Sequence, residues 1–356
     1  MNRIICFAFV LSLVLSACGG TPPPAETEVP VLATEAPATE VQSTEAPALE
    51  PVTLTINESP LITQAPIFIA DAEGYFAEQA ITMEYVTFNR TEEALPLLIT
   101  GDLDIYAGGI NAGLFNALGQ DDSIKVVADR GHIASSDPCT FQAILIRRDL
   151  YESGQVTSPA GLAGQPIGSA TAGSSGFLLS TYLSKAGLTF DDVEMTTVPT
   201  AAYVDSFANK TLAAIVTPEL HVTRLLVAGN AVILASAEDE FEFLQTSVLA
   251  YGKNLIADNP EVGRRFMIAY LKGVAQYNEG KTPRNLEILS ERMGEPVENL
   301  AAACWVSINS DGAIDFSGVE GFQLWSVAQG DLDKAITEEQ FMDPTFAAEA
   351  YNLLGK

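Results

Sequence analysis

The sequence predicts an α/β protein with two lobes, each built on a β-sheet, and three observations support this class. The chain has 356 residues, enough for about two domains of ordinary size. Hydrophobic residues make up 47% of the chain, so a sizeable core can form. Strand patterns alternate with helical patterns, and this rhythm restarts once along the chain, which is typical of two α/β units.

The first unit begins where apolar and polar residues start to alternate, at residues 52–56. We expect strands at residues 52–56, 81–86, 103–107 and 124–128, and helices at residues 65–79, 91–100 and 111–118. Gly74 interrupts the first helix, and Gly108-Gly109 ends the third strand. This β-α order predicts a sheet covered by helices.

The second unit repeats this order. We expect strands at residues 141–146, 166–169, 193–198, 212–217 and 231–234, and helices at residues 174–186, 201–208 and 219–228. Gly187 and Gly229 follow two of these helices and predict their C-terminal ends.

The C-terminal third returns to one strand and then becomes helical. We expect a strand at residues 245–251 and helices at residues 261–279, 283–293, 297–303 and 319–330. We therefore assign residues 52–140 and 246–356 to a first lobe and residues 141–245 to a second, with the helical C-terminal part packing on the first lobe. Ligands of such folds bind in the crevice at the carboxyl ends of the strands.

The N-terminal segment predicts export and lipid anchoring. Residues 1–17 read as a signal peptide, with Arg3 before a short apolar run. The run ends in Leu15-Ser16-Ala17-Cys18-Gly19, which resembles a lipoprotein cleavage site and predicts lipidation of Cys18. An ordinary secretory signal with a chance cysteine is the alternative. Residues 18–51 contain seven prolines and no aromatic residue, which predicts a disordered tether on the extracytoplasmic face of the cell membrane.

The chain is strongly acidic because it contains few bases. It has 18 Lys and Arg against 46 Asp and Glu, giving a net charge of −28. Arg3 and the six glutamates of residues 19–51 account for the difference from the −23 carried by the remainder. Nucleic acids and anionic membrane surfaces require clustered bases, so neither is an expected partner.

Two cysteines, Cys139 and Cys304, belong to the folded part in an oxidising compartment. We prefer buried free thiols, and a disulfide is the alternative, because nothing in the sequence brings the two residues together. Neither cysteine has a CxxC partner or a nearby histidine, so we expect no metal site.

Several segments resemble the solute-binding lipoproteins of ABC importers, in the nitrate/sulfonate/taurine and thiamine-pyrimidine-precursor branch. Residues 65–70 followed by Glu73-Gly74-Tyr75-Phe76 resemble the first helix and the GYF turn of that family. Residues 101–105, 158–168 and 309–315 resemble further family motifs in the same order. The resemblance implies a periplasmic-binding-protein type 2 fold that closes on a small molecule and delivers it to an ABC permease and its ATPase. We expect a monomer without cofactor or enzymatic activity.

Loops at the strand ends supply the candidate ligand contacts. Glycines and small hydroxyl residues at the start of a helix expose backbone N–H groups to acceptors and anions. The candidates are Gln64, Gly108, Gly109, Asn111, Thr140, Ser174, Ser175, Gly176, Phe177, Tyr203, Thr217 and Glu219. Their structural alternatives are helix caps for Gln64, Ser174 and Glu219, a tight turn at the glycines, and a core position for Phe177.

The ligand class is less determined. These loops contain no obvious Arg or Lys, and an acidic body slows the approach of anions. We therefore favour a neutral heterocycle, such as a pyrimidine vitamin precursor or a flavin, over an anion of the sulfonate, nitrate or taurine type. A sensor module without transport is another alternative. A serine hydrolase is a further one, because residues 172–176 nearly match the G-x-S-x-G elbow and His221 follows.

Overall fold

The computed structural model describes residues 49–88 and 91–355. The expected signal peptide, Cys18 and the tether as far as residue 48 lie outside this part. No helix in the described ranges is long and apolar enough to cross a membrane. The described residues form one compact unit.

Two five-stranded sheets organise the described residues, which confirms the expected α/β class. The first sheet has the order β2-β1-β3-β10-β4, with bounds Ile81–Thr87, Val52–Glu58, Ile105–Gly109, Phe243–Tyr251 and Lys125–Ala134. Strand β10 runs antiparallel to β3 and β4, whereas β1 runs parallel to β2 and β3. We call the elements around this sheet the first lobe.

The second sheet has the order β7-β6-β8-β5-β9, with bounds Glu194–Thr196, Pro166–Gly168, Ala214–Pro218, Gln142–Arg147 and Ala231–Ser236. Strands β7, β6 and β8 are parallel, and β5 runs antiparallel to β8 and β9. We call the elements around this sheet the second lobe. The residue boundaries of the two lobes remain our proposal.

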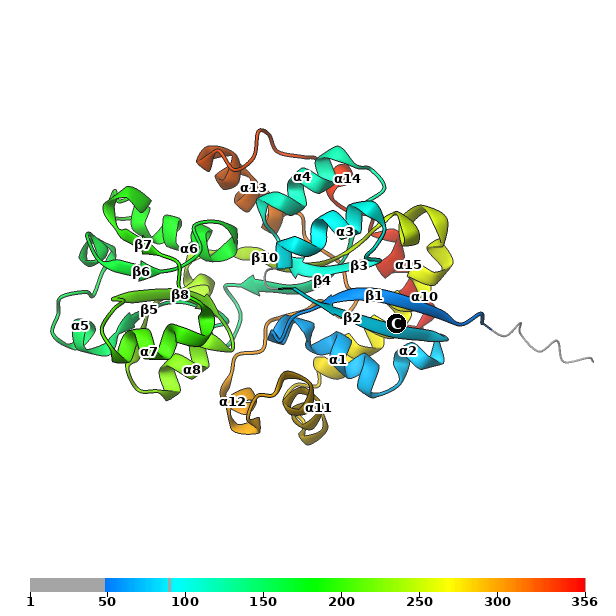
Figure 1. Cartoon of the computed structure of the whole chain (residues 1–356), viewed down its shortest axis with the longest axis horizontal. Helices are drawn as coiled ribbons and strands as arrows, with labels where there is room; N and C mark the ends of the chain where they lie inside the picture. The colour runs from blue at the N-terminus through cyan, green and yellow to red at the C-terminus, as the bar shows by residue number, and fades with distance from the viewer. Residues whose placement is uncertain (1–48, 89–90, 356) are drawn as a thin grey trace, which may run out of the picture. The chain divides into compact units, whose positions relative to one another are not determined.

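Helices cover both faces of each sheet (Figure 1). In the first lobe, α1 and α2 lie on one face and α3 and α4 on the other; their bounds are Ala65–Ala72, Tyr75–Glu78, Leu95–Thr100 and Ala112–Gln120. The second lobe carries α5, α6, α7, α8 and α9, at Arg148–Glu152, Gly173–Ser184, Tyr203–Ala208, His221–Val227 and Ala237–Glu240. Short 3-10 turns lie at Ile62–Gln64, Thr91–Ala94, Pro159–Leu162, Phe190–Asp192 and Thr200–Ala202, and a π turn lies at Asn254–Asp258.

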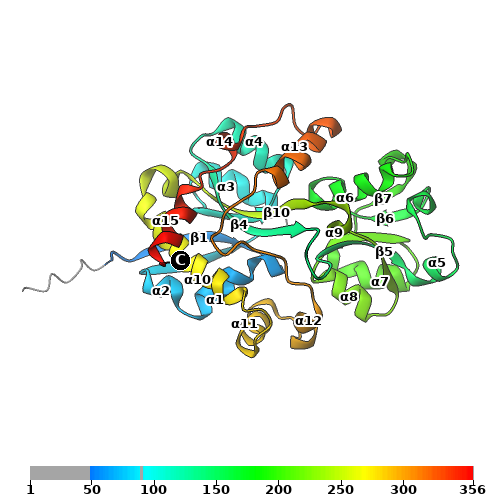
Figure 2. The same cartoon turned by 180° about the vertical axis from the view of Figure 1, so that it is seen from behind.

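The C-terminal part is helical and packs on the first lobe, as the view from behind shows (Figure 2). It contains α10 to α15, at Pro260–Tyr277, Pro283–Met293, Val297–Ala302, Ser317–Gln329, Glu338–Phe341 and Thr345–Leu353. Helix α10 packs against α1, α2 and α15. A Cβ at Gly273 of α10 would lie 2.1 Å from the carbonyl oxygen of Pro66, so α10 approaches α1 this closely only with glycine there.

Buried apolar residues join these layers. The larger core cluster takes residues from both lobes and from the C-terminal helices, including Ile56, Phe68, Phe266 and Phe322. A smaller cluster lies between the second sheet and helices α7 and α8 and contains Phe207 and Tyr203. Apolar residues are therefore packed on both faces of the sheets.

Candidate functional site

Strand ends of both sheets surround one cleft with a cavity volume of about 280 Å³. The first lobe contributes Thr63, Asn111 and Arg130, and the second lobe contributes Gln142 and Glu219. A crevice at the ends of sheet strands is where α/β folds bind ligands. The cleft is thus the candidate ligand site of this chain.

The structure brings five of the predicted residues into the lining of this cleft. They are Gly109, Asn111, Ser174, Ser175 and Glu219. The remaining candidates lie outside the lining: Gln64, Gly108, Thr140, Gly176, Phe177, Tyr203 and Thr217.

Arg130 lines the cleft, which corrects the expectation that the site lacks a basic side chain. It lies on β4 and is only 1% exposed. Burial lowers the pKa of its guanidinium to about 10, so the side chain stays charged at neutral pH. Its Nη1 donates a hydrogen bond to Oε1 of Gln64 at 2.8 Å. The cleft therefore contains a buried positive charge.

Gln64 lies outside the lining of the cleft and contacts Arg130, which is part of it. It is fully buried, and its Nε2 donates to the carbonyl oxygen of Asn57 at 3.1 Å while its Oε1 accepts from Arg130. The amide is thus fixed at both ends. Its role in this structure is to orient the Arg130 guanidinium.

Asp129 directly precedes Arg130 in sequence, carries the opposite charge and is fully buried. Its Oδ1 accepts from the Gly131 N–H and from Gln245 Nε2, both at 2.8 Å. Its Oδ2 lies 2.7 Å from His132 Nδ1. Burial disfavours the imidazolium of His132, but the hydrogen bond and charge of Asp129 outweigh it and raise the pKa of His132. This network holds β4 and β10 together behind the cleft.

Helix α6 starts at the second-lobe side of the cleft without a side-chain cap. Its N-cap residue is Ala172, so Ser174 does not serve as the cap. Ser175 Oγ accepts a hydrogen bond from Gln142 Nε2 at 3.0 Å. A Cβ at Gly176 would lie 2.2 Å from the carbonyl oxygen of Thr171, so only glycine permits this tight start of the helix.

Glu219 and Asn111 line the cleft, but their polar atoms have internal partners. Glu219 accepts from the N–H and Oγ1 of Thr223 at 2.9 and 2.7 Å and from the Cys304 N–H at 3.0 Å. Burial raises the pKa of Glu219 despite these bonds. Asn111 Oδ1 accepts from the Leu114 N–H at 3.0 Å and caps α4. Glu219 therefore also stabilises the start of α8, which was its structural alternative, and the capping role of Asn111 is one that the sequence analysis did not assign.

The remaining candidates occupy core or connecting positions. Phe177 packs on Phe241, Phe322 and Trp325 with ring centroids 4.7, 5.9 and 5.3 Å apart. Tyr203 belongs to the core of the second lobe, and Thr217 is 1% exposed. A Cβ at Gly108 would lie 2.0 Å from the Tyr106 ring. Thr140 lies in the segment between β4 and β5 and directly follows Cys139.

The expectation of free thiols is wrong, because Cys139 and Cys304 form a disulfide with their Cα atoms 5.6 Å apart. The bond joins the segment between β4 and β5 to the segment after α12. Phe141, in the same crossing segment, donates its N–H to Glu238 Oε1 at 2.7 Å. The disulfide and this hydrogen bond therefore fix the segment between β4 and β5, and both join residues that are far apart in sequence.

The geometry gives no support to the hydrolase alternative. His221 packs edge-to-face on Tyr203, with ring centroids 5.6 Å apart. Burial lowers the pKa of His221 to about 4, followed by a contribution from the charge of Arg224. Within the described residues there is no hydrogen bond from Ser174 to this ring.

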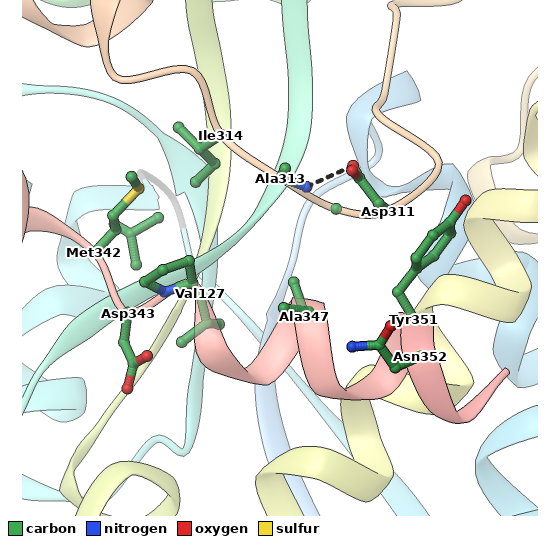
Figure 3. Close-up of a pocket in the computed structure, with 13 residues that line it drawn as sticks. Val127, Asp311, Ala313, Ile314, Met342, Asp343, Ala347, Tyr351 and Asn352 are labelled. Atoms are coloured by element: carbon green, nitrogen blue, oxygen red, sulfur yellow. Dashed lines mark hydrogen bonds between the residues drawn. The ribbon is translucent and has the colours of Figure 1, made fainter. Parts of the chain in front are cut away.

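A second hollow lies on the first lobe, away from the cleft (Figure 3). It has a volume of about 210 Å³ and apolar walls formed by side chains such as Val127, Ile314 and Met342. Asp311 at its edge accepts from the Ala313 N–H at 3.0 Å, and Asp343 accepts from the Thr345 N–H at 2.9 Å. Because these carboxylates already have partners, the hollow offers a polar solute less than the cleft does.

Comparison with known proteins places the chain in a family. A family model described as NMT1/THI5 like matches residues 62–279. The chain belongs to the NMT1/THI5-like family. The riboflavin-binding protein RibY of Chloroflexus aurantiacus is 26% identical over 274 residues, which cover 77% of this chain and 73% of that protein.

Solved structures confirm the periplasmic-binding-protein type 2 fold of this family member. The ligand-binding component of an ABC-type import system from Staphylococcus aureus, solved with zinc bound, matches with a TM-score of 0.69 and 15% identity over 84% of this chain and 98% of that one. The periplasmic aliphatic sulphonate binding protein SsuA from Escherichia coli matches with a TM-score of 0.67 and 16% identity over 83% and 93%. These two structures therefore share the fold of this chain. Within residues 49–88 and 91–355, no group of three His, Cys, Asp or Glu is placed to hold a metal ion.

Proposed function

We propose that this chain captures a small neutral heterocycle in the cleft and delivers it to an ABC importer. The observation that carries the proposal is the position of the cleft, lined by strand ends of both lobes. A solute that contacts both lobes stabilises the arrangement in which they close on it, and a permease can then recognise that arrangement. We propose a monomer that binds its solute without turnover.

Membrane attachment completes this proposal. A lipid on Cys18 would hold the chain at the extracytoplasmic face of the cell membrane, and the tether would give the lobes reach toward a permease and its ATPase. The deficit of bases argues against attachment through anionic lipid headgroups.

One relative supports a flavin as the heterocycle, since RibY carries the name of a riboflavin-binding protein. A pyrimidine vitamin precursor is the other heterocycle we consider. One observation favours a second class of solute: the buried guanidinium of Arg130 would pair with a sulfonate or nitrate.

A thermal-shift screen of the full-length chain separates these classes. The probes are riboflavin, an aminopyrimidine, ethanesulfonate and nitrate, each against a buffer control. A solute at 100 times its dissociation constant stabilises the folded chain by about 2.7 kcal/mol, which is readily measured. Stabilisation by the heterocycles supports the proposal, whereas stabilisation by the anions alone contradicts it.

A further inference from the structure

We propose that the cleft recognises one amide edge of its ligand, a ring carbonyl with an adjacent N–H, and that the two lobes divide this edge between them. The inference rests on the proposed function and narrows its solute to cyclic amides and imides. Flavins carry such an edge on their pyrimidinedione ring.

Three buried polar atoms without a partner carry the inference. Within the described part of the chain, Thr63 Oγ1, Arg130 Nε and Gln142 Oε1 have no hydrogen-bond partner. Their side chains belong to residues that are 2%, 1% and 0% exposed, and all three residues line the cleft. Buried polar groups in native proteins are nearly always hydrogen-bonded, so such a cluster points to a ligand that supplies the missing bonds.

The first lobe offers two donors on elements that pack together. Thr63 lies in the 3-10 turn Ile62–Gln64, and this turn packs against β4, which carries Arg130. Arg130 Nε–H only donates, and the Thr63 hydroxyl is free to donate. A carbonyl oxygen has two lone pairs and accepts from both side chains at once.

The second lobe offers an acceptor. Gln142 Nε2 already donates to Ser175 Oγ at 3.0 Å, which leaves Oε1 as the free end of the amide. A carbonyl oxygen of this kind requires an N–H from the ligand. The ligand edge therefore needs an acceptor toward the first lobe and a donor toward the second.

This pattern selects among the solute classes. A sulfonate or nitrate presents only acceptor oxygens, so it would pair with Arg130 but set an oxygen against Gln142 Oε1. The ring nitrogen of an aminopyrimidine has one lone pair and would leave Thr63 or Arg130 without an acceptor. A lactam or imide edge satisfies all three side chains. Because it joins the lobes, it also favours their closed arrangement.

The test compares riboflavin with 3-methylriboflavin, in which a methyl group replaces the hydrogen of the ring N–H. Quenching of flavin fluorescence on titration with the full-length chain gives both dissociation constants. We expect the methyl compound to bind about 30-fold more weakly, because Gln142 Oε1 loses its donor and stays unpaired. In Gln142→Leu we expect both compounds to bind with dissociation constants within about threefold of each other, since the acceptor is gone.

Thr63→Val provides a second test that does not depend on the first variant folding. Valine keeps the shape of threonine and removes a hydroxyl that has no internal partner. We expect an unchanged or higher melting temperature and about tenfold weaker riboflavin binding. Ser326→Ala is the matched control, because Ser326 Oγ is also buried without a partner but lies on α13, outside the lining of the cleft. Its riboflavin affinity should equal that of the wild type.

The outcomes separate the inference from the function on which it rests. If nitrate or ethanesulfonate binds and riboflavin does not, the proposed function is wrong, and the inference falls with it. If riboflavin binds but the methyl compound binds equally well, or if Gln142→Leu still discriminates, the inference alone is wrong. Unchanged riboflavin binding in Thr63→Val also overturns the assignment of the carbonyl to the first lobe.

Discussion

Breaking the Cys139–Cys304 disulfide should lower the free energy of unfolding substantially. The two cysteines are 165 residues apart, so the bond closes a long loop in the unfolded chain. In the chain-entropy model a loop of this length corresponds to about 5 kcal/mol, and loss of a native disulfide typically costs about 2–5 kcal/mol. We expect the double variant Cys139→Ala, Cys304→Ala to lose an amount in this range. Because the Cys304 N–H donates to Glu219, the cleft should also become less ordered.

Urea unfolding followed by tryptophan fluorescence measures this loss. Trp305 directly follows Cys304 and stacks on Tyr277 with ring centroids 5.2 Å apart, so its emission reports on the segment that the bond holds. The wild-type chain is measured with and without a reductant. The double variant is the control, since a reductant has no bond to break in it. An identical midpoint for oxidised and reduced wild type would refute the reasoning.

Three further predictions concern local features. Gly176→Ala should cost about 1–3 kcal/mol, because its Cβ would meet the Thr171 carbonyl, and a thermal melt checks this. Burial lowers the pKa of His221 to about 4, so the folded wild-type chain loses stability as the pH drops from about 6.5 toward 4. His221→Asn should remove this loss. Urea midpoints measured across this pH window compare the two chains. Thr282→Ala should cost about 1 kcal/mol, because the Thr282 side chain accepts from the Asn285 N–H at the start of α11, and the shift in melting temperature measures it.

Hydrophobic periodicity predicted most of the fold because it records burial directly. The expected strand at residues 52–56 is β1, and the expected helix at residues 261–279 is α10 within two residues at each end. The strand expected at residues 124–128 was too short, since β4 continues to Ala134. The apolar pattern stops at Asp129, whose charge is buried only because Gln245 and His132 pair with it. Partners that come from distant segments do not appear in local periodicity.

The site was predictable in position but only in part by residue. The strand-end rule located the loops that carry Ser174, Ser175 and Glu219. It missed Arg130, which lies on β4 beyond the end of the expected strand, and Gln142, which is the first residue of β5. The signal that would have found Arg130 is a charged residue inside a buried strand, because such a charge requires either a partner or a ligand. The disulfide was equally hidden, because the proximity of Cys139 and Cys304 is a product of tertiary folding.

The location of charge is one reason for our proposal of a neutral ligand over an anion. The net negative charge outside the N-terminal segment repels an approaching anion, although salt at physiological strength screens this repulsion beyond about 8 Å. Inside the cleft there is a positive charge instead, because Arg130 is buried and charged. A neutral ring carbonyl gains the strong hydrogen bond to the guanidinium, and the negative charge of the protein does not repel the ligand that carries it. The same carbonyl leaves Arg130 its positive charge beside the buried Asp129, whereas a bound anion would add a second negative charge to this region.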